Sequence, residues 1–300
     1  MKKALVLTGS DSDIAKLVAL EREFNKAGID FEKKIASAHR NTQKVEELVR
    51  MAEETGIEVL MGGAGMSAHL AGVMSAYTKK LPVIGMPFSS KEFPDGEDAY
   101  LSMSQMPPGV PVLTAGVDAS GYAAQAAINI INTNKTNKVS VVTYSAEDLE
   151  RVKSMLKVLD ELGIDWKHTE LQRNGLTDHA KAKQIEGYSS VIATGRIGNG
   201  NFLDISAAAR DTTMPVIMVP IPSGVNAKET IRFVQSAQKD SPFLNTGTAS
   251  VNAALAAAAI TGVCGEKLTA WRDKQSETAW AKNTEYDKHT IESYVNRSEK

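Results

Sequence analysis

Cysteine is nearly absent from this chain of 300 residues, in which Cys264 stands alone. No intrachain disulfide can therefore form, and a reducing compartment fits this composition. A lone cysteine of this kind is usually a buried packing residue. Cysteine and histidine also never recur at the spacing of metal ligands, so we expect no zinc site.

Long apolar runs and a strong net charge are missing as well. No stretch approaches the roughly 18 apolar residues of a membrane-spanning helix, and the apolar run at 4–7 is too short for a signal peptide and indicates a strand. The net charge of −2 gives no support for nucleic acid or an anionic membrane as partner. A small anionic ligand stays compatible, because one local pocket can be positive on a nearly neutral protein.

Three common motifs are also absent: the G-x-S-x-G nucleophile turn, the P-loop and the G-x-G-x-x-G dinucleotide fingerprint. What is present is an ordinary globular composition, with 42% hydrophobic and 23% charged residues. At about 150 residues per domain, the length predicts two domains.

Short apolar runs alternate with helical patterns, which predicts an α/β fold with parallel strands covered on both faces. In the first half, strands are expected at 4–7, 31–35, 59–61, 82–86 and 110–115. Helices are expected at 11–27, 43–54, 68–77 and 123–131.

The pattern then repeats, which indicates a duplicated domain. Residues 139–143 correspond to 5–9, 161–166 to 26–31, 188–193 to 57–62, and 214–220 to 81–87. We therefore expect domains at 1–134 and 135–264, joined at the polar stretch 132–138. A helical tail would follow at 265–300, with Trp271 and Trp280 as docking points.

Three loops in the first half follow strands, at the edge where open α/β sheets bind ligands. In the first, Gly9 permits a tight turn, and Ser10, Ser12 and Asp13 offer polar groups beside a helix start, which suits a phosphate. A plain helix cap is the alternative, and this loop alone favours it.

The second loop places His39 beside Arg40, after Ser37 and Ala38. Arginine grips phosphate with a bidentate fork, and histidine moves protons near neutral pH. An incidental pair on the surface remains the alternative for this loop.

The third loop holds Gly63, Ala64 and Gly65, followed by His69 at a helix start. Small residues let a ligand approach the backbone closely. Taken alone, His69 is more readily explained as a structural histidine.

Together these loops resemble the PurE family of purine biosynthesis. The segments that carry the resemblance are 9–13, 37–40, 63–70, 81–87 and 105–112. The resemblance extends over nearly all of residues 1–131, and the segments stand in the family's order and spacing.

The resemblance implies a fold, a reaction and a set of roles. It implies two flavodoxin-like αβα domains with parallel sheets, and a substrate of aminoimidazole ribonucleotide type, with no metal or organic cofactor. Ser10, Ser12, Ser37 and Arg40 would hold the phosphate, and Asp13 the ribose. His39 would carry the proton, while His69 and residues 63–65 would line the carboxylate pocket, and residues 105–108 would help to cover it.

Within that family, the loops look like the mutase branch, which uses the N5-carboxy compound; the branch that uses CO2 directly is the alternative. A ribonucleotide sensor without activity also stays open, because Asn41, Thr42, Gln43 and Ala71 depart from the family pattern. A flavin-binding protein is a more distant alternative.

The second half lacks the catalytic residues. Asn174 stands at the position of His39, and Asn201 stands near that of His69. We expect this half to serve as scaffold and to supply Asn252, which begins a family helix pattern missing from the first half. The resemblance further implies a cytoplasmic homo-oligomer, a tetramer of tandem chains.

Overall fold

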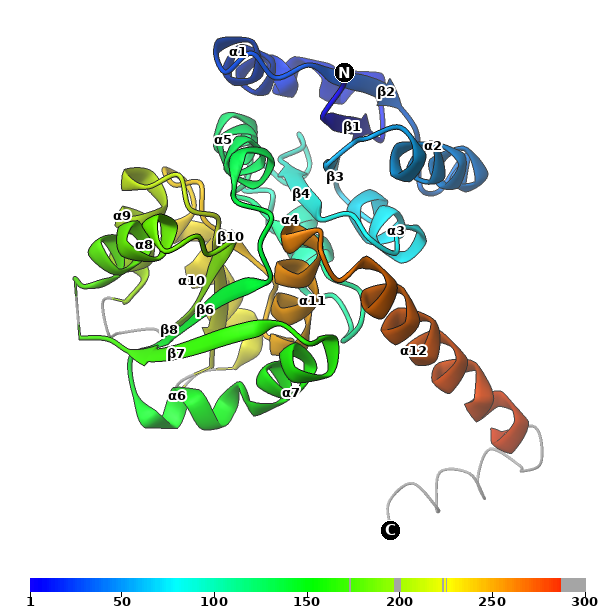
Figure 1. The fold of residues 1–300 in the computed structure, drawn as a ribbon. Coiled ribbons are helices and arrows are strands. Elements are labelled where there is room, and N and C mark those ends of the chain that lie inside the picture. The colour runs from blue at the N-terminus through cyan, green and yellow to red at the C-terminus, as the bar shows by residue number, and fades with distance from the viewer. Residues whose placement is uncertain (173, 197–200, 223, 225, 287–300) are drawn as a thin grey trace.

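The protein forms one continuous α/β sheet (Figure 1). The computed structural model describes residues 1–172, 174–196, 201–222, 224 and 226–286. Within them, a ten-stranded sheet has the order β2-β1-β3-β4-β5-β10-β9-β8-β6-β7. The strands are β1 (Ala4–Thr8), β2 (Phe31–Ile35), β3 (Val59–Gly65), β4 (Val83–Phe88), β5 (Leu113–Thr114), β6 (Lys138–Thr143), β7 (Asp165–Glu170), β8 (Ser190–Arg196), β9 (Val216–Ile221) and β10 (Leu244–Asn245).

The two halves of the sheet have the same strand order, 2-1-3-4-5, and their pairings are parallel. The α/β class expected from the sequence is confirmed. The sequence match between 5–9 and 139–143 is wrong by one residue. The first strand of each half ends at a threonine, so Thr8 corresponds to Thr143.

Helices cover both faces of this sheet. On one face, a single hydrophobic core runs through both halves. Its helices are α1 (Val18–Lys26), α5 (Ser120–Asn132), α7 (Lys153–Leu162) and α11 (Ser250–Thr261).

The opposite face has a separate core for each half. The first lies under α2 (Thr42–Glu54), α3 (Leu70–Tyr77) and α4 (Glu97–Ser104), and the second under α8 (Leu176–Ile185), α9 (Asn201–Asp211) and α10 (Ala227–Ala237). Three elements complete the fold: the 3₁₀ helix η1 (Asp11–Leu17), α6 (Ala146–Arg151) and α12 (Gly265–Tyr286).

The two predicted sheets are joined where β5 pairs with β10, antiparallel, at Thr114 and Asn245. Around this bridge the buried Tyr100 donates to Gln238 Oε1, and Asn245 Nδ2 donates to Tyr100 and to the Thr114 carbonyl. Polar groups buried in this way are costly unless they are satisfied, so the bonds fix how the halves meet.

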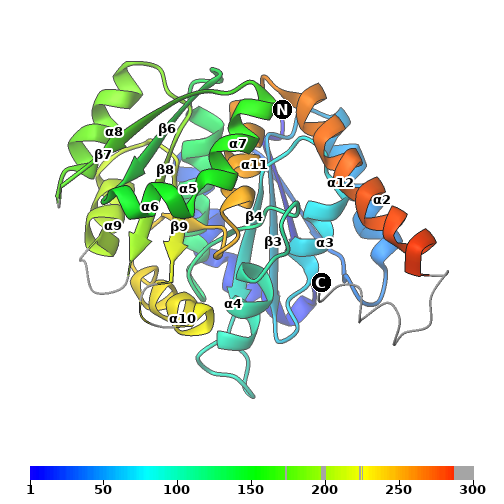
Figure 2. The same ribbon diagram turned by 90° about the horizontal axis from the view of Figure 1, so that it is seen from below.

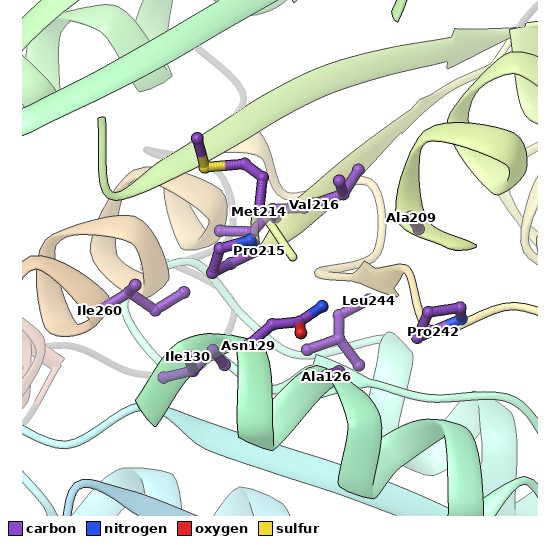
Figure 3. Close-up of a pocket in the computed structure, with 11 residues that line it drawn as sticks. Ala126, Asn129, Ile130, Ala209, Met214, Pro215, Val216, Pro242, Leu244 and Ile260 are labelled. Atoms are coloured by element: carbon purple, nitrogen blue, oxygen red, sulfur yellow. The ribbon is translucent and has the colours of Figure 1, made fainter. Parts of the chain in front are cut away.

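Contacts outside the sheet support the same junction. Helices α4 and α10 lie side by side (Figure 2), and Arg232 pairs with Glu97 across them at 2.7 Å. A cavity of about 10 Å³ remains between α5 and the second half (Figure 3). There Asn129 extends toward Met214 and Leu244, and the space is close to the lower limit for one water molecule.

Helix α12 leaves the body of the protein after its first turns (Figure 1). Trp271 Nε1 donates to Glu161 at 2.9 Å, and the buried Arg272 donates to the Ser75 carbonyl. The docking expected of Trp271 is therefore observed. For Trp280 the expectation is wrong within this chain, because that side chain is 76% exposed.

Two further differences from the sequence prediction have local causes. The strand expected at 110–115 is only two residues long, since Pro111 lacks the N–H that a ladder needs. Helix α4 was not predicted; it begins after Gly96, whose φ of +61° suits glycine, and it is short.

Candidate functional site

The loops that follow β1, β2, β3 and β4 surround one open cavity of about 1030 Å³. It lies at the carboxyl ends of the parallel strands, where open α/β sheets bind ligands. Of the residues that the sequence singled out, the cavity is lined by Gly9, Ser10, Ser12, Asp13, Ser37, Ala38, His39, Arg40, Ala64, Gly65 and His69.

Gly63 is the predicted site residue that does not line the cavity. A Cβ atom at this position would lie 2.6 Å from the Phe88 ring, so the glycine is required for β3 to pack against β4. Gly65 has a similar role at the cavity edge, since a Cβ there would lie 3.1 Å from the Phe88 carbonyl oxygen.

The first two loops form a polar wall rich in hydrogen-bond donors. Ser10 Oγ caps η1 by accepting from the Ser12 N–H at 3.3 Å, and the two hydroxyls lie 3.0 Å apart. Arg40 Nη2 donates to the Gly9 carbonyl at 2.9 Å, which ties the second loop to the first. The cap that the sequence offered as an alternative is thus present, and its hydroxyls also line the cavity.

The two histidines of the cavity contact each other directly. His39 Nε2 lies 2.8 Å from His69 Nδ1, and the rings meet edge to face at 86°. One nitrogen must donate and the other accept, so the pair shares one proton in this bond. Both side chains are exposed to the cavity, which argues against a merely structural role for His69.

Asp13 lies on η1, facing the cavity. Burial raises the pKa of the Asp13 carboxyl above its ordinary value, and the nearby charge of Lys16 opposes this shift in part. The Asp13 carboxyl group is thus a polar group of the cavity wall, beside the Ser10 and Ser12 hydroxyls.

Sequence reasoning missed several residues that line the cavity. They are Lys16, Met66, Ser67, Leu70, Ser89, Ser90, Lys91 and Glu92. Lys16 lies one turn after Asp13 on η1, a spacing that could have indicated it. The residues from 89 to 92 follow β4, and a rule that loops after parallel strands carry ligands would have included them.

Lys16 ties η1 to the loops that follow β4 and β5. Its Nζ donates to the Ser89 carbonyl at 2.7 Å, to Ser89 Oγ at 2.8 Å and to Asp118 Oδ1 at 2.6 Å. Burial alone would raise the pKa of Asp118, but the hydrogen bonds from Lys16 and Ser89 outweigh it and hold the pKa below its usual range. The wall after β4 is thereby fixed to η1.

The segment 105–108, expected to help cover the site, does not line the cavity. It precedes β5 and so lies at the amino end of that strand, away from the carboxyl ends. Its Pro107 carbonyl and the Gly109 N–H are held by the side-chain amide of Asn252, at 3.0 and 2.9 Å. Asn252, on α11, therefore supports the first half from the second.

The matching edge of the second half is built differently. Arg196 ends β8 where Gly65 ends β3, and it pairs with the buried Asp148, which corresponds to Asp13. Arg196 Nη2 also lies 3.2 Å from Glu147. Asn174 and Asn201 are described, with Asn174 at a φ of +62° and Asn201 buried, whereas Arg173 and residues 197–200 lie outside the described residues.

Among the residues that the structure describes, His, Cys, Asp and Glu nowhere form a group of three or more that could hold a metal ion. In the same part of the chain, none of the helices combines the length and the apolar character needed to span a membrane.

The fold and the cavity define an α/β protein with a polar site at its strand ends, and comparison with known proteins gives the family. Residues 3–137 match the AIR carboxylase family. The N5-carboxyaminoimidazole ribonucleotide mutase of Pyrococcus abyssi is 41% identical over 151 residues, which cover 50% of this chain and 86% of that protein. The mutase of Thermotoga maritima is 35% identical over 164 residues, covering 54% and 95%.

A phosphoribosylaminoimidazole carboxylase of Candida albicans is 34% identical over 161 residues, covering 53% of this chain and 28% of that protein. Among solved structures, the transcription regulator CcpA of Lactococcus lactis aligns over 80% of this chain and 89% of that one, at 9% identity. The TM-score of this alignment is 0.24, which is too low to indicate a shared fold. The chain belongs to the AIR carboxylase family, also called PurE, and the resemblance seen in the sequence is confirmed.

Proposed function

We propose that this chain converts N5-carboxyaminoimidazole ribonucleotide to 4-carboxyaminoimidazole ribonucleotide, a step of de novo purine biosynthesis. The observation that carries the proposal is the His39–His69 pair, hydrogen-bonded at 2.8 Å in a cavity that is also lined by Arg40 and by several serines. The relatives from Pyrococcus abyssi and Thermotoga maritima, which are named for this reaction and align over 86% and 95% of their length, support the proposal.

The reaction needs one group that both gives and takes a proton. As the carboxyl group leaves the exocyclic nitrogen as CO2, that nitrogen gains a proton from His39. Carbon 4 of the ring then attacks the trapped CO2, and its proton passes to His39, so the histidine returns to its first state and nothing is consumed. A positioned histidine suits this work, because its ordinary pKa lies near neutral pH.

The cavity walls supply the remaining roles in this proposal. Arg40, Ser10, Ser12 and Ser37 hold the phosphate, since guanidinium and hydroxyl donors pair well with its oxygens. Asp13 accepts hydrogen bonds from the ribose hydroxyls. His69, Ala64 and Gly65 line the place where CO2 is held, where small residues leave room, and Gly63 supports them from behind by letting β3 pack against Phe88.

The direct use of CO2 with aminoimidazole ribonucleotide is the second candidate, favoured by the relative from Candida albicans whose name is that of a carboxylase. A sensor that binds the ribonucleotide without turnover is the third. The paired histidines weigh against it, since binding alone does not require a shared proton between two imidazoles.

The second half acts as scaffold in this proposal. The two repeats, 1–134 and 135–264, would derive from one duplicated domain, which agrees with their common strand order. Asp148, which corresponds to Asp13, is paired with Arg196 and is therefore not free to bind a substrate. Asn252 supports the first half through its hydrogen bond with Gly109. We further propose that four copies of this chain form a homo-oligomer in the cytoplasm.

The deciding experiment is an ATP-free assay of 4-carboxyaminoimidazole ribonucleotide formation by the full chain. It compares the N5-carboxy compound with aminoimidazole ribonucleotide plus bicarbonate. Turnover of the first at low bicarbonate is expected. Preference for the second substrate would assign the carboxylase, and binding without turnover of either would assign the sensor.

A further inference from the structure

Met66 has a backbone conformation that is unfavourable for its side chain. Its φ is +55°, in the left-handed region that glycine and asparagine adopt readily and a long apolar residue does not. Among the described residues other than glycine, only Asp118 and Asn174 share a positive φ, and both carry short polar side chains that tolerate it. The methionine is therefore the exception.

Packing does not compensate for this strain. The Met66 side chain is 50% exposed and belongs to none of the hydrophobic cores of the described chain. Strained residues persist where the surroundings or the function require them. Because burial does not stabilise Met66 here, the cavity that it lines is the place to look for the reason.

The composition of the cavity wall shows what Met66 adds. The other apolar side chains in the lining are two alanines and Leu70, which is 1% exposed and belongs to the core beneath. The rest is mostly polar or charged. Met66 is thus the long apolar group of this lining that is open to a ligand, and it precedes His69 by three residues.

We propose that Met66 contacts the flat five-membered ring of the ribonucleotide and makes the site specific for ligands that carry this ring. This inference rests on the proposed function and deepens it. A thioether is flexible and polarisable, and it makes favourable contacts with aromatic rings. The polar wall near Arg40 holds the ribose phosphate, and Met66 covers the ring near the histidine pair.

The test is calorimetric titration of the full chain with two ligands, aminoimidazole ribonucleotide and ribose 5-phosphate, which lacks the ring. Met66→Gly removes the side chain and relieves the strain. We expect a rise in Tm of about 2–4 °C. The Kd for the ribonucleotide should rise about tenfold, which corresponds to partial burial of one methionine. The Kd for ribose 5-phosphate should change less than about twofold.

Two matched variants separate strain from contact. Met66→Ala keeps the strain and loses the contact, so it should weaken the ribonucleotide as much as Met66→Gly but without the gain in Tm. Met66→Leu keeps an apolar side chain and should bind almost as the natural chain does. In both variants residue 66 keeps a Cβ atom, as in the natural chain, so the backbone strain stays the same.

Unchanged ribonucleotide affinity in Met66→Gly, or equal weakening of both ligands, would overturn the role of Met66 and leave the proposed function standing. Failure of the natural chain to bind aminoimidazole ribonucleotide would instead overturn the proposed function, and this inference with it.

Discussion

His39 Nε2 and His69 Nδ1 lie 2.8 Å apart, although the two residues belong to different loops and are separated by 30 positions. This bond orients His39 within the cavity and gives its proton a second carrier. If His39 moves the proton between nitrogen and carbon 4, its loss cannot be replaced by binding groups elsewhere. Positioned acid–base groups typically contribute about 10²–10⁴-fold to a rate.

The first prediction is therefore that His39→Asn lowers kcat by about 10²–10⁴-fold, while the fold and the ribonucleotide Kd change little. Turnover assays and calorimetric titration measure the two quantities. His168→Asn is the control, since His168 bonds Thr143 in the second half. Wild-type turnover in His39→Asn would remove this histidine from the mechanism.

The sequence predicted the site better than it predicted how the halves meet. The motif residues lie in short loops that each follow a strand, so the three loops taken together, with their resemblance to a known family, indicated a site at the strand ends. The junction depends on Tyr100 and Gln238, which are 138 positions apart, and on strands of two residues. No periodic pattern can reveal strands of that length.

The unrecognised parts of the site have similar causes. Lys16 and Asp118 are 102 positions apart, so their contact depends on the tertiary fold. The strain at Met66 comes from its positive φ angle, and this angle cannot be predicted from the type of residue. In the second half, the sequence showed the missing histidine but not the ion pair of Arg196 with Asp148.

Arg40 gives the second prediction. Its guanidinium faces the cavity and already donates to the Gly9 carbonyl at 2.9 Å. Arg40→Ala should raise KM and Kd for the ribonucleotide about tenfold to a hundredfold, because hydrogen bonds to a charged group contribute about 1.5–3 kcal/mol. For the matching nucleoside, which lacks the phosphate, the same substitution should have little effect.

The control for Arg40 is Arg50→Ala. Arg50 pairs with Glu46 on the surface of α2 and does not line the cavity. The KM of the Arg50→Ala variant should match that of the natural chain. Equal losses for nucleotide and nucleoside in Arg40→Ala would contradict the assignment of Arg40 to the phosphate.

The third prediction concerns pH and Asp118. Hydrogen bonds from Lys16 and Ser89 hold the pKa of Asp118 below its ordinary value. A lowered folded-state pKa contributes stability above the unfolded pKa, near 3.9, which is lost as the pH falls through the folded pKa. Asp118→Asn should therefore cost about 0.5–1 kcal/mol at pH 7, because the pair is partly open to solvent.

The cost of Asp118→Asn should shrink as the pH falls below about 4. Urea unfolding from pH 7 to pH 3 measures it, and Asp240→Asn, on an exposed aspartate of the second half, is the control. A cost that stays constant over this range would show that the Asp118 carboxylate does not stabilise the loop through its charge.

The last prediction concerns Arg272, which fixes α12 to the first half. Its side chain is buried and donates to the Ser75 carbonyl, and burial lowers its pKa to about 10. The guanidinium remains charged at pH 7. Arg272→Ala should lower the free energy of unfolding by about 2–4 kcal/mol, because it removes both a buried hydrogen bond and the packing of a long side chain.

Lys274→Ala provides the comparison for Arg272, since Lys274 is exposed on the same helix and should change stability by less than about 0.5 kcal/mol. Urea unfolding of both variants measures the difference. If α12 contributes only to contacts between chains, the two substitutions will be equally mild in dilute protein. A large loss confined to Arg272→Ala would instead place the first turns of α12 within the folded core of a single chain.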